Sequence, residues 1–196
     1  MTALFKTAQR LQEFCLKRRW KFCFIGGVAV LRWGQIRVTK DVDMTLLTGF
    51  GDEEAFVDEV MAHYKIRAVG GRDFALKNRV LLVEDETGVP VDIALGAIPF
   101  EERSIDRSTL WEADTGLFLR TCSAEDLLVH KCFANRDIDW SDVENILARQ
   151  ANRINFAQLE AELKPLAQLK SEAPILATLA RKIQGQNAPF TRPDQP

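Results

Sequence analysis

The feature that most constrains this chain is the stretch FIGGVAVLRWGQIRVTKDVDMTLL at 24–47, where residues unusual in buried segments interrupt two short apolar runs. A Gly-Gly pair closes the first run, and two aspartates one residue apart open the second. The pattern predicts a strand that ends at the glycines, a helix directly after them, and a second strand that begins at the aspartates. Any fold of this chain must therefore place two carboxylates at the entrance of a buried strand.

The pattern around this stretch predicts further helices and strands. Apolar residues recur at helical spacing over 3–19, and 52–64 carries acids in its first turn, so both are predicted helices. Residues 74–96 are predicted as two strands joined by a turn, with the acids at 84–86 at the solvated end of this hairpin. A short strand is expected at 117–122.

From Ser123 onward the sequence predicts helices alone. Ser123 followed three residues later by Asp126 matches a helix capping box. Three more helices are expected around 139–150, 155–169 and 174–183. We therefore predict an α+β fold in which a small mixed β-sheet is flanked by helices and followed by a helical C-terminal part.

The composition is typical of an ordinary soluble globule. The chain has 196 residues, of which 46% are hydrophobic and 28% charged, enough to bury a core. We expect a core with its N-terminal helix over 1–121, a helical part packed on it over 122–184, and a flexible, proline-containing tail over 185–196. No apolar run has membrane-spanning length and the N-terminus lacks the order of a secretory signal, so we expect a cytoplasmic protein without a membrane partner.

The four cysteines predict buried free thiols. Cys15, Cys23, Cys122 and Cys132 form no Cys-x-x-Cys pair, and none stands beside a histidine at zinc-finger spacing. Each lies among apolar residues, where a reduced cysteine behaves as a small hydrophobic side chain.

The net charge of −2 conceals a basic N-terminal segment. Residues 1–40 contain nine Lys or Arg and one acid, and the basic share includes KRRWK at 17–21. Cations around a tryptophan suit a phosphate backbone and a stacked base, so an RNA acceptor bound through 17–21 is one expectation. The alternative is a solvated helix end, since cations also favour helix C-termini.

The paired aspartates Asp41 and Asp43 indicate a metal site. Residues two apart on a strand share one face, and two unpaired carboxylates that close repel each other. A divalent cation removes this conflict, and magnesium favours hard oxygen ligands. Asp92, within VPVDIALG, places a third carboxylate in an otherwise buried strand, and three carboxylates from two neighbouring strands suit two magnesium ions, with Mn²⁺ as a substitute for Mg²⁺. The alternatives are a surface turn for the pair and an edge-strand acid for Asp92.

Gly26 and Gly27 supply a site for phosphates. A strand that ends in Gly-Gly and leads into a helix presents backbone N–H groups at the helix N-terminus. The absence of side chains lets a triphosphate approach the main chain. A Gly-Gly pair alone is most often a tight turn, but here Asp-x-Asp follows 14 residues later at a strand entrance.

With its elements in this order, IGGVAVLRWGQIRVTKDVDMTLL resembles the first motif of the nucleotidyltransferase superfamily with the DNA polymerase β-type catalytic fold. The form R-x-T-x-D-x-D, made by Arg37, Thr39, Asp41 and Asp43, is similar to the AbiEii-like branch, whose members are often toxins of toxin–antitoxin pairs. The resemblance implies magnesium-dependent transfer of a nucleoside monophosphate from a triphosphate to a hydroxyl of RNA, tRNA included, or of protein. It also implies an antitoxin protein as a partner.

The resemblance continues in DLLVHKCFANRDIDWSDV at 126–143. Lys131 stands where the family lysine touches nucleotide phosphates, and Asp139 and Asp142 match a D-x-x-D that helps orient or activate the acceptor. The residues that the resemblance assigns to nucleotide binding are Gly26, Gly27, Arg37, Thr39, Lys131, Asp139 and Asp142, and those assigned to catalysis are Asp41, Asp43, Asp92 and Lys131. From the residues alone, Lys131 could be a surface lysine and the two aspartates N-terminal helix acids.

Gly27 departs from the family pattern, because many relatives have serine there. The glycine removes a hydroxyl that would contact a phosphate. A second class of function also stays open, a non-catalytic module that keeps the fold and binds nucleotide or a partner protein. Three clustered carboxylates argue against that class, because they destabilise a fold that does not use them.

Overall fold

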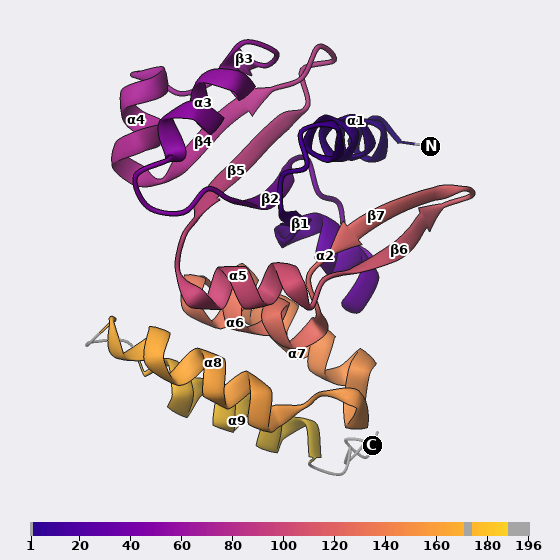
Figure 1. Cartoon of the computed structure of the whole chain (residues 1–196). Coiled ribbons are helices and arrows are strands. Elements are labelled where there is room, and N and C mark those ends of the chain that lie inside the picture. Colours follow the sequence, from indigo (N-terminus) through magenta and orange to yellow (C-terminus); the bar gives the residue numbers. More distant parts are fainter. Residues whose placement is uncertain (1, 171–173, 188–196) are drawn as a thin grey trace.

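One mixed sheet of seven strands forms the centre of the molecule, in a computed structural model that describes residues 2–170 and 174–187 (Figure 1). The strands are β1 (Phe22–Phe24), β2 (Val42–Leu47), β3 (Lys65–Ile66), β4 (Val80–Glu84), β5 (Pro90–Gly96), β6 (Thr109–Asp114) and β7 (Leu117–Thr121). The α-helices are α1 (Ala3–Lys17), α2 (Gly26–Trp33), α3 (Glu53–Met61), α4 (Gly71–Asn78), α5 (Pro99–Asp106), α6 (Ala124–Ala134), α7 (Asp137–Gln150), α8 (Phe156–Gln168) and α9 (Ile175–Asn187). The strand order is β3-β4-β5-β2-β1-β7-β6, which makes β3 and β6 the edges.

Side-chain alternation along the central strands separates two hydrophobic cores, one on each face of the sheet. Val42, Met44 and Leu46 of β2 belong to the core formed with α1, α3 and α4. Cys23 of β1 belongs to the other core, which includes α5 and the C-terminal helices that lie together in Figure 1. Asp43 alternates with Val42 and Met44, so its side chain points to this second face, where it meets the first turn of α2.

The α+β prediction of a small mixed sheet flanked by helices, with a helical C-terminal part, is confirmed. Ser123 caps α6 as predicted, since its Oγ accepts the N–H of Asp126 at 3.1 Å. Helix α9 extends beyond its expected end at 183, and 188–196 of the expected tail lie outside the described residues. The division of the chain at 121 stays a prediction. Over the described ranges, none of the helices combines the length and apolarity needed to cross a membrane.

The segment before β4 is predicted as a strand and folds instead as a helix. Residues 74–78 form the second half of α4, which begins after the left-handed Gly70 (φ +87°). The helix ends at Arg79, also left-handed (φ +53°), and the chain enters β4 directly. Ala75 is the one residue of α4 that is fully buried, so helical periodicity is barely visible in this sequence. The sequence also did not predict β3, β6 and α5. Strand β3 has only two residues, and β6 is an edge strand with no buried residue, so neither gives a clear apolar pattern.

Asp85 corrects the expectation of a solvated hairpin end at 84–86. Its side chain is buried under α1, where it accepts a hydrogen bond from Oγ1 of Thr7 at 2.5 Å and pairs with Arg10. Burial acts to raise the pKa of Asp85, but hydrogen bonds from Thr7, Thr87 and other donors lower it to about 2. The residue therefore anchors α1 to the turn between β4 and β5.

The four cysteines are free and buried, as predicted. Burial raises the pKa of Cys15, Cys23 and Cys132 to about 12. These thiols stay protonated near neutral pH and are poor nucleophiles.

Candidate active site

The predicted carboxylates lie on two neighbouring parallel strands in the middle of the sheet. Strands β2 and β5 pair in register, with Asp43 directly opposite Asp92. Asp41 lies one residue before β2, two positions from Asp43, and residues at this spacing share a face. Neighbouring strands are about 4.8 Å apart. The three residues therefore lie together on one face of the sheet, near the starts of β2 and β5. The prediction that the strand of Asp92 lies beside that of Asp43 is confirmed.

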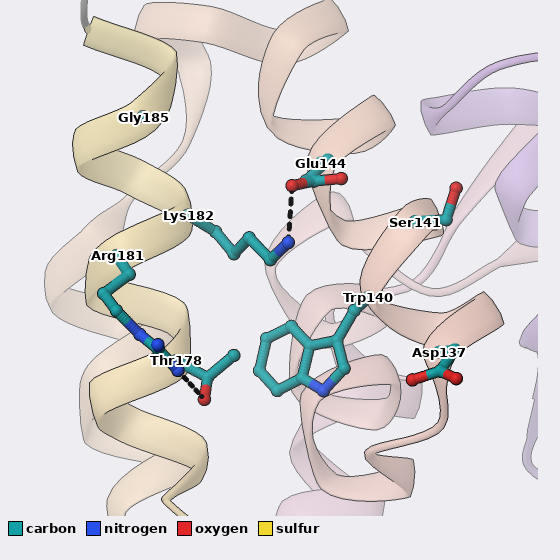
Figure 2. A pocket seen from close by; sticks show the side chains of 8 residues that line it. All are labelled: Asp137, Trp140, Ser141, Glu144, Thr178, Arg181, Lys182 and Gly185. Atoms are coloured by element: carbon teal, nitrogen blue, oxygen red, sulfur yellow. Dashed lines mark hydrogen bonds and ion pairs between the residues drawn. The ribbon is translucent and has the colours of Figure 1, made fainter.

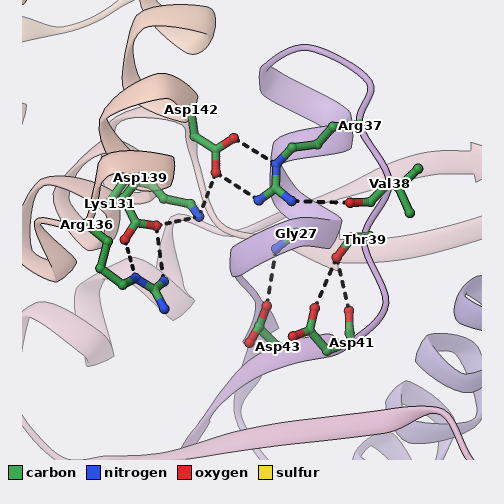
Figure 3. Close-up of polar contacts among 10 residues, drawn as sticks. All are labelled: Gly27, Arg37, Val38, Thr39, Asp41, Asp43, Lys131, Arg136, Asp139 and Asp142. Carbon is green, nitrogen blue, oxygen red and sulfur yellow. Dashed lines mark hydrogen bonds and ion pairs between the residues drawn. The ribbon is translucent and has the colours of Figure 1, made fainter.

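The N-terminus of α2 lies against Asp43, as Figure 3 shows for Gly27. The backbone N–H of Gly27 donates to Oδ2 of Asp43 at 3.2 Å. At Gly26, where φ is +51°, a Cβ would lie 2.0 Å from the same oxygen, so this position requires glycine. Ile25, the N-cap residue, makes no side-chain capping hydrogen bond. The first turn of α2 therefore receives no cap from its own N-cap residue, and Asp43 is the side chain that accepts the N–H of Gly27.

Thr39 connects the glycine turn to the Asp-x-Asp motif. Its Oγ1 donates to Oδ1 of Asp41 at 3.1 Å. A Cβ at Gly27 would lie 2.1 Å from this same Oγ1. The departure from serine at position 27 thus has a physical reason, since Thr39 fills the space that a side chain there would need.

Lys131 of α6 lies between Asp139 and Asp142 of α7 (Figure 3). Its Nζ is 2.9 Å from Oδ1 of Asp139 and 2.8 Å from Oδ2 of Asp142. Lys131 is 6% exposed, and the two aspartates are 0% and 2% exposed. The alternative of a surface lysine is therefore wrong, and the late motif forms a buried charged cluster.

Two arginines complete this cluster. Arg37 makes a bidentate contact with Asp142, through Nε at 2.8 Å and Nη2 at 2.9 Å. Arg136 pairs with Asp139 through Nε at 2.6 Å, and its side chain is 71% exposed. Asp139 is the main cause of the raised pKa of Arg136, and the charges of Asp43 and Asp142 add to it. Arg136 was not predicted, although its position three residues before Asp139 is a usable signal.

The carboxylates of the site are held in an unfavourable environment. Burial raises the pKa of Asp43 to about 6, and the charge of Asp41 adds to this effect. Burial also raises the pKa of Asp92, while Arg67 opposes the shift. Burial, with a smaller effect of neighbouring carboxylates, therefore disfavours the charged form of both residues, and a nearby divalent cation would favour it.

Arg67, which directly follows β3, forms an ion pair with Asp92 that the sequence did not predict. The backbone N–H of Arg67 donates to the carbonyl of Leu82 at 3.0 Å, and Leu82 lies opposite Asp92. Arg67, Leu82, Asp92 and Asp43 thus follow one another across the sheet. The pairing joins residues 25 apart through a two-residue edge strand, which leaves no local sequence signal.

The donor set suits magnesium, although the carboxylates engage other partners. Within the described ranges, no three Asp, Glu, His or Cys side chains are grouped closely enough to hold a metal ion as they stand. Asp41, Asp43 and Asp92 instead contact Thr39, Gly27 and Arg67. Hard carboxylate oxygens of like charge on one face are nevertheless the ligands that magnesium prefers. The residues fit the ion chemically, provided that Asp92 exchanges its partner.

The basic segment 17–21 lies at the opposite end of β2 from the carboxylates. The N–H of Leu47, at the end of β2, donates to the carbonyl of Lys21, whereas Asp43 lies near its start. Four strand residues correspond to roughly 13 Å. Arg18, Arg19 and Lys21 therefore lie away from the carboxylates, because β1 carries the chain from this segment to the glycine turn.

Part of this segment also has partners inside the fold. Arg18 pairs with Glu59, and its guanidinium lies 3.6 Å from the centre of the Phe14 ring. Trp20 packs against Phe56 with 4.8 Å between the ring centres. These contacts fix α1 on α3, so Arg18 and Trp20 have a structural role.

Two hollows of the described structure differ in whether site residues line them. One of about 670 Å³ lies between α7 and α9 and is lined by Trp140 and Lys182 but by none of the predicted site residues (Figure 2). Another of about 450 Å³ is lined by Arg37 and Thr39 of the site together with mostly apolar side chains, among them Trp111. The second hollow therefore shares Arg37 and Thr39 with the candidate site, but Asp41 and Asp43 do not line it.

Comparison with known proteins supports the fold. No protein-family model and no curated protein matches the sequence. An antigenic nucleotidyltransferase-like protein from Paracoccidioides brasiliensis matches with a TM-score of 0.54 at 14% identity, over 92% of this chain and 93% of its own. The antibiotic-resistance factor ANT(2'')-Ia matches with a TM-score of 0.52 at 12% identity, over 85% of this chain and 91% of its own. The chain therefore shares its fold with a nucleotidyltransferase-like protein and with an antibiotic-resistance factor. Neither match bears on the AbiEii-like branch, which stays a resemblance of motifs.

Proposed function

We propose that this protein is a magnesium-dependent nucleotidyltransferase that moves a nucleoside monophosphate from a nucleoside triphosphate to an acceptor hydroxyl. The observation that carries the proposal is the placement of Asp41, Asp43 and Asp92 on one face, beside the uncapped N-terminus of α2. The fold shared with nucleotidyltransferases supports it.

The carboxylates and the glycine turn have distinct roles in this proposal. Asp41, Asp43 and Asp92 would hold two magnesium ions, or manganese in their place, which when bound stabilise the attacking oxygen and the leaving pyrophosphate. Gly26 and Gly27 put no side chain of their own over the first turn of α2, so its backbone N–H groups would bind the triphosphate once Asp43 exchanges the N–H of Gly27 for a metal ion. Thr39 orients Asp41 through its hydrogen bond.

The cluster around Lys131 supplies positive charge to the phosphates. Lys131 is buried and fixed by two aspartates, so it acts through its field and not as a mobile ligand. Arg37 and Arg136 have side chains that are 32% and 71% exposed, and they are the groups of the cluster that reach phosphate oxygens.

The acceptor is proposed at the level of its reacting group, a hydroxyl. RNA, tRNA included, and protein remain the candidates that the motif resemblance implies, with a toxin role and an antitoxin partner. The hollow beside Arg37 and Thr39 favours an acceptor with an apolar group next to its hydroxyl. A structural neighbour named as an antibiotic-resistance factor makes a small molecule a further candidate. The alternative of a non-catalytic nucleotide-binding or partner-binding module keeps the same triphosphate site.

The test is transfer of label from each α-labelled nucleoside triphosphate, with magnesium, to total RNA, to total protein and to the protein itself. Asp43→Asn should abolish transfer, and Glu86→Gln, at a side chain 77% exposed beyond the site, should leave it unchanged. Triphosphate-dependent thermal stabilisation without any transfer would favour the non-catalytic module. No transfer and no stabilisation would overturn the proposal.

A further inference from the structure

The ion pair between Arg67 and Asp92 places a fixed cation where the proposed function needs a metal. We propose that Arg67 is an internal counter-ion that competes with divalent cations for Asp92, so that the ion pair and the bound metal exclude each other. The inference rests on the proposed function in one respect, the assignment of Asp92 as a metal ligand.

The position of Arg67 makes this contact specific. Its backbone continues the ladder of β3 and donates to Leu82, which lies opposite Asp92 on β5. The guanidinium therefore reaches across one strand, on the carboxylate face, to contact Oδ1 of Asp92. Asp43 is the next residue in the same row. The guanidinium of Arg67 carries one charge and pairs with Asp92, whereas a divalent ion carries two charges and can be coordinated by several carboxylates at once.

The surroundings of Arg67 allow its side chain to move away from Asp92. Strand β3 pairs with β4 through Lys65 and Ile66 at the edge of the sheet. Two residues beyond Arg67, Val69 is 98% exposed. The Arg67 and Asp92 side chains are 36% and 31% exposed, so water reaches both partners of the pair. A partly exposed ion pair of this kind exchanges partners at low energetic cost.

The direction in which removal of Arg67 changes metal affinity distinguishes a competing arginine from one that supports the metal site. An arginine that orients Asp92 for the metal would strengthen metal binding, and its removal would weaken the site. A competing arginine has the opposite effect, since its removal frees Asp92. Arg72 is a matched control, because its side chain is 35% exposed and pairs with Glu54 and Asp58, which are not site residues.

The experiment measures Mn²⁺ binding to the full chain without nucleotide, from the free-ion signal in electron paramagnetic resonance. Arg67→Met should bind Mn²⁺ about fivefold more tightly than wild type, the upper range for a partly exposed ion pair. Arg72→Met, with the same change in net charge, should bind as wild type does. Arg67→Gln gives a second uncharged side chain, and circular dichroism checks that each variant is folded.

Equal Mn²⁺ affinity of Arg67→Met and Arg72→Met, or weaker binding by Arg67→Met, would overturn the inference. Asp43→Asn separates this failure from that of the proposed function. Mn²⁺ binding that Asp43→Asn abolishes but Arg67→Met does not tighten would remove the role of Arg67 and leave the metal site intact. Binding that is absent from every variant would overturn the metal site as well.

Discussion

Side chains at position 27 and at Thr39 exclude one another, because a Cβ added to Gly27 would lie 2.1 Å from Oγ1 of Thr39 and 2.8 Å from its Cβ. The same Oγ1 hydrogen-bonds Asp41. A side chain at position 27 would therefore displace Thr39, and with it the hydrogen bond that Thr39 donates to Asp41. This explains why the serine of many relatives is incompatible with the present position of Thr39.

Gly27→Ser should destabilise the protein by about 1–3 kcal/mol, the usual cost of overpacking. In a Thr39→Ala background the same substitution should cost less, since Oγ1 and Cγ2 of residue 39 are gone and only the contact with its Cβ at 2.8 Å is left. Urea unfolding of the four proteins gives the coupling energy. Additive costs would mean that Thr39 is not the residue that excludes the side chain.

Asp43→Asn should stabilise the protein at neutral pH by roughly 3 kcal/mol, because the pKa of Asp43 rises from 3.8 to about 6 on folding. The native state binds this proton more tightly than the unfolded state, so the favourable contribution is fully present below pH 3.8 and is lost as the pH rises to about 6.

The difference in unfolding free energy between Asp43→Asn and wild type should therefore be near zero at pH 3.5 and reach its plateau above pH 6.5. Urea unfolding at five pH values in the absence of metal checks this. A difference that does not change with pH would show that burial of Asp43 does not perturb its titration.

Much of the site could be predicted because its signals are local in the sequence. The Gly-Gly turn and Asp41 and Asp43 lie within one strand–helix–strand unit, and Asp92 is an acid within an apolar strand. Alternation then places the carboxylates on the correct face. What the sequence could not provide is the register between β2 and β5, which depends on packing of both strands against the helices.

The parts that escaped prediction depend on contacts between distant segments. Arg67 reaches Asp92 through a two-residue strand, and Asp85 is buried because α1 covers it. Helix α4 looked like a strand because Ala75 is its one fully buried residue. In each case tertiary packing, and not local propensity, sets the structure.

Lys131→Met should destabilise the protein by about 3–5 kcal/mol, since it leaves Asp139 and Asp142 buried without the cation between them. The double variant Lys131→Met/Asp139→Asn should recover part of this loss. Thermal or urea unfolding tests both statements, and a Lys131→Met protein as stable as wild type would contradict the buried cluster.

Because the double variant is expected to fold, it is the better background in which to measure triphosphate affinity, which should fall more than nucleoside affinity.

The basic segment 17–21 yields a test that separates structure from RNA binding. Arg18→Glu should lower the Tm by about 2–4 °C, the change expected for a loss near 1 kcal/mol in a chain of this size, because it removes the cation from the Phe14 ring. Arg19 is exposed and makes no cation–π contact with the described part of the chain, so Arg19→Glu should leave the Tm unchanged. Since this segment lies roughly 13 Å along β2 from Asp43, Arg19→Glu should also leave label transfer and RNA affinity unchanged. RNA affinity at two salt concentrations checks the second statement. Weaker RNA binding with a flatter salt dependence would restore the segment as an acceptor surface, with each lost phosphate contact lowering the slope by about 0.7 to 0.9.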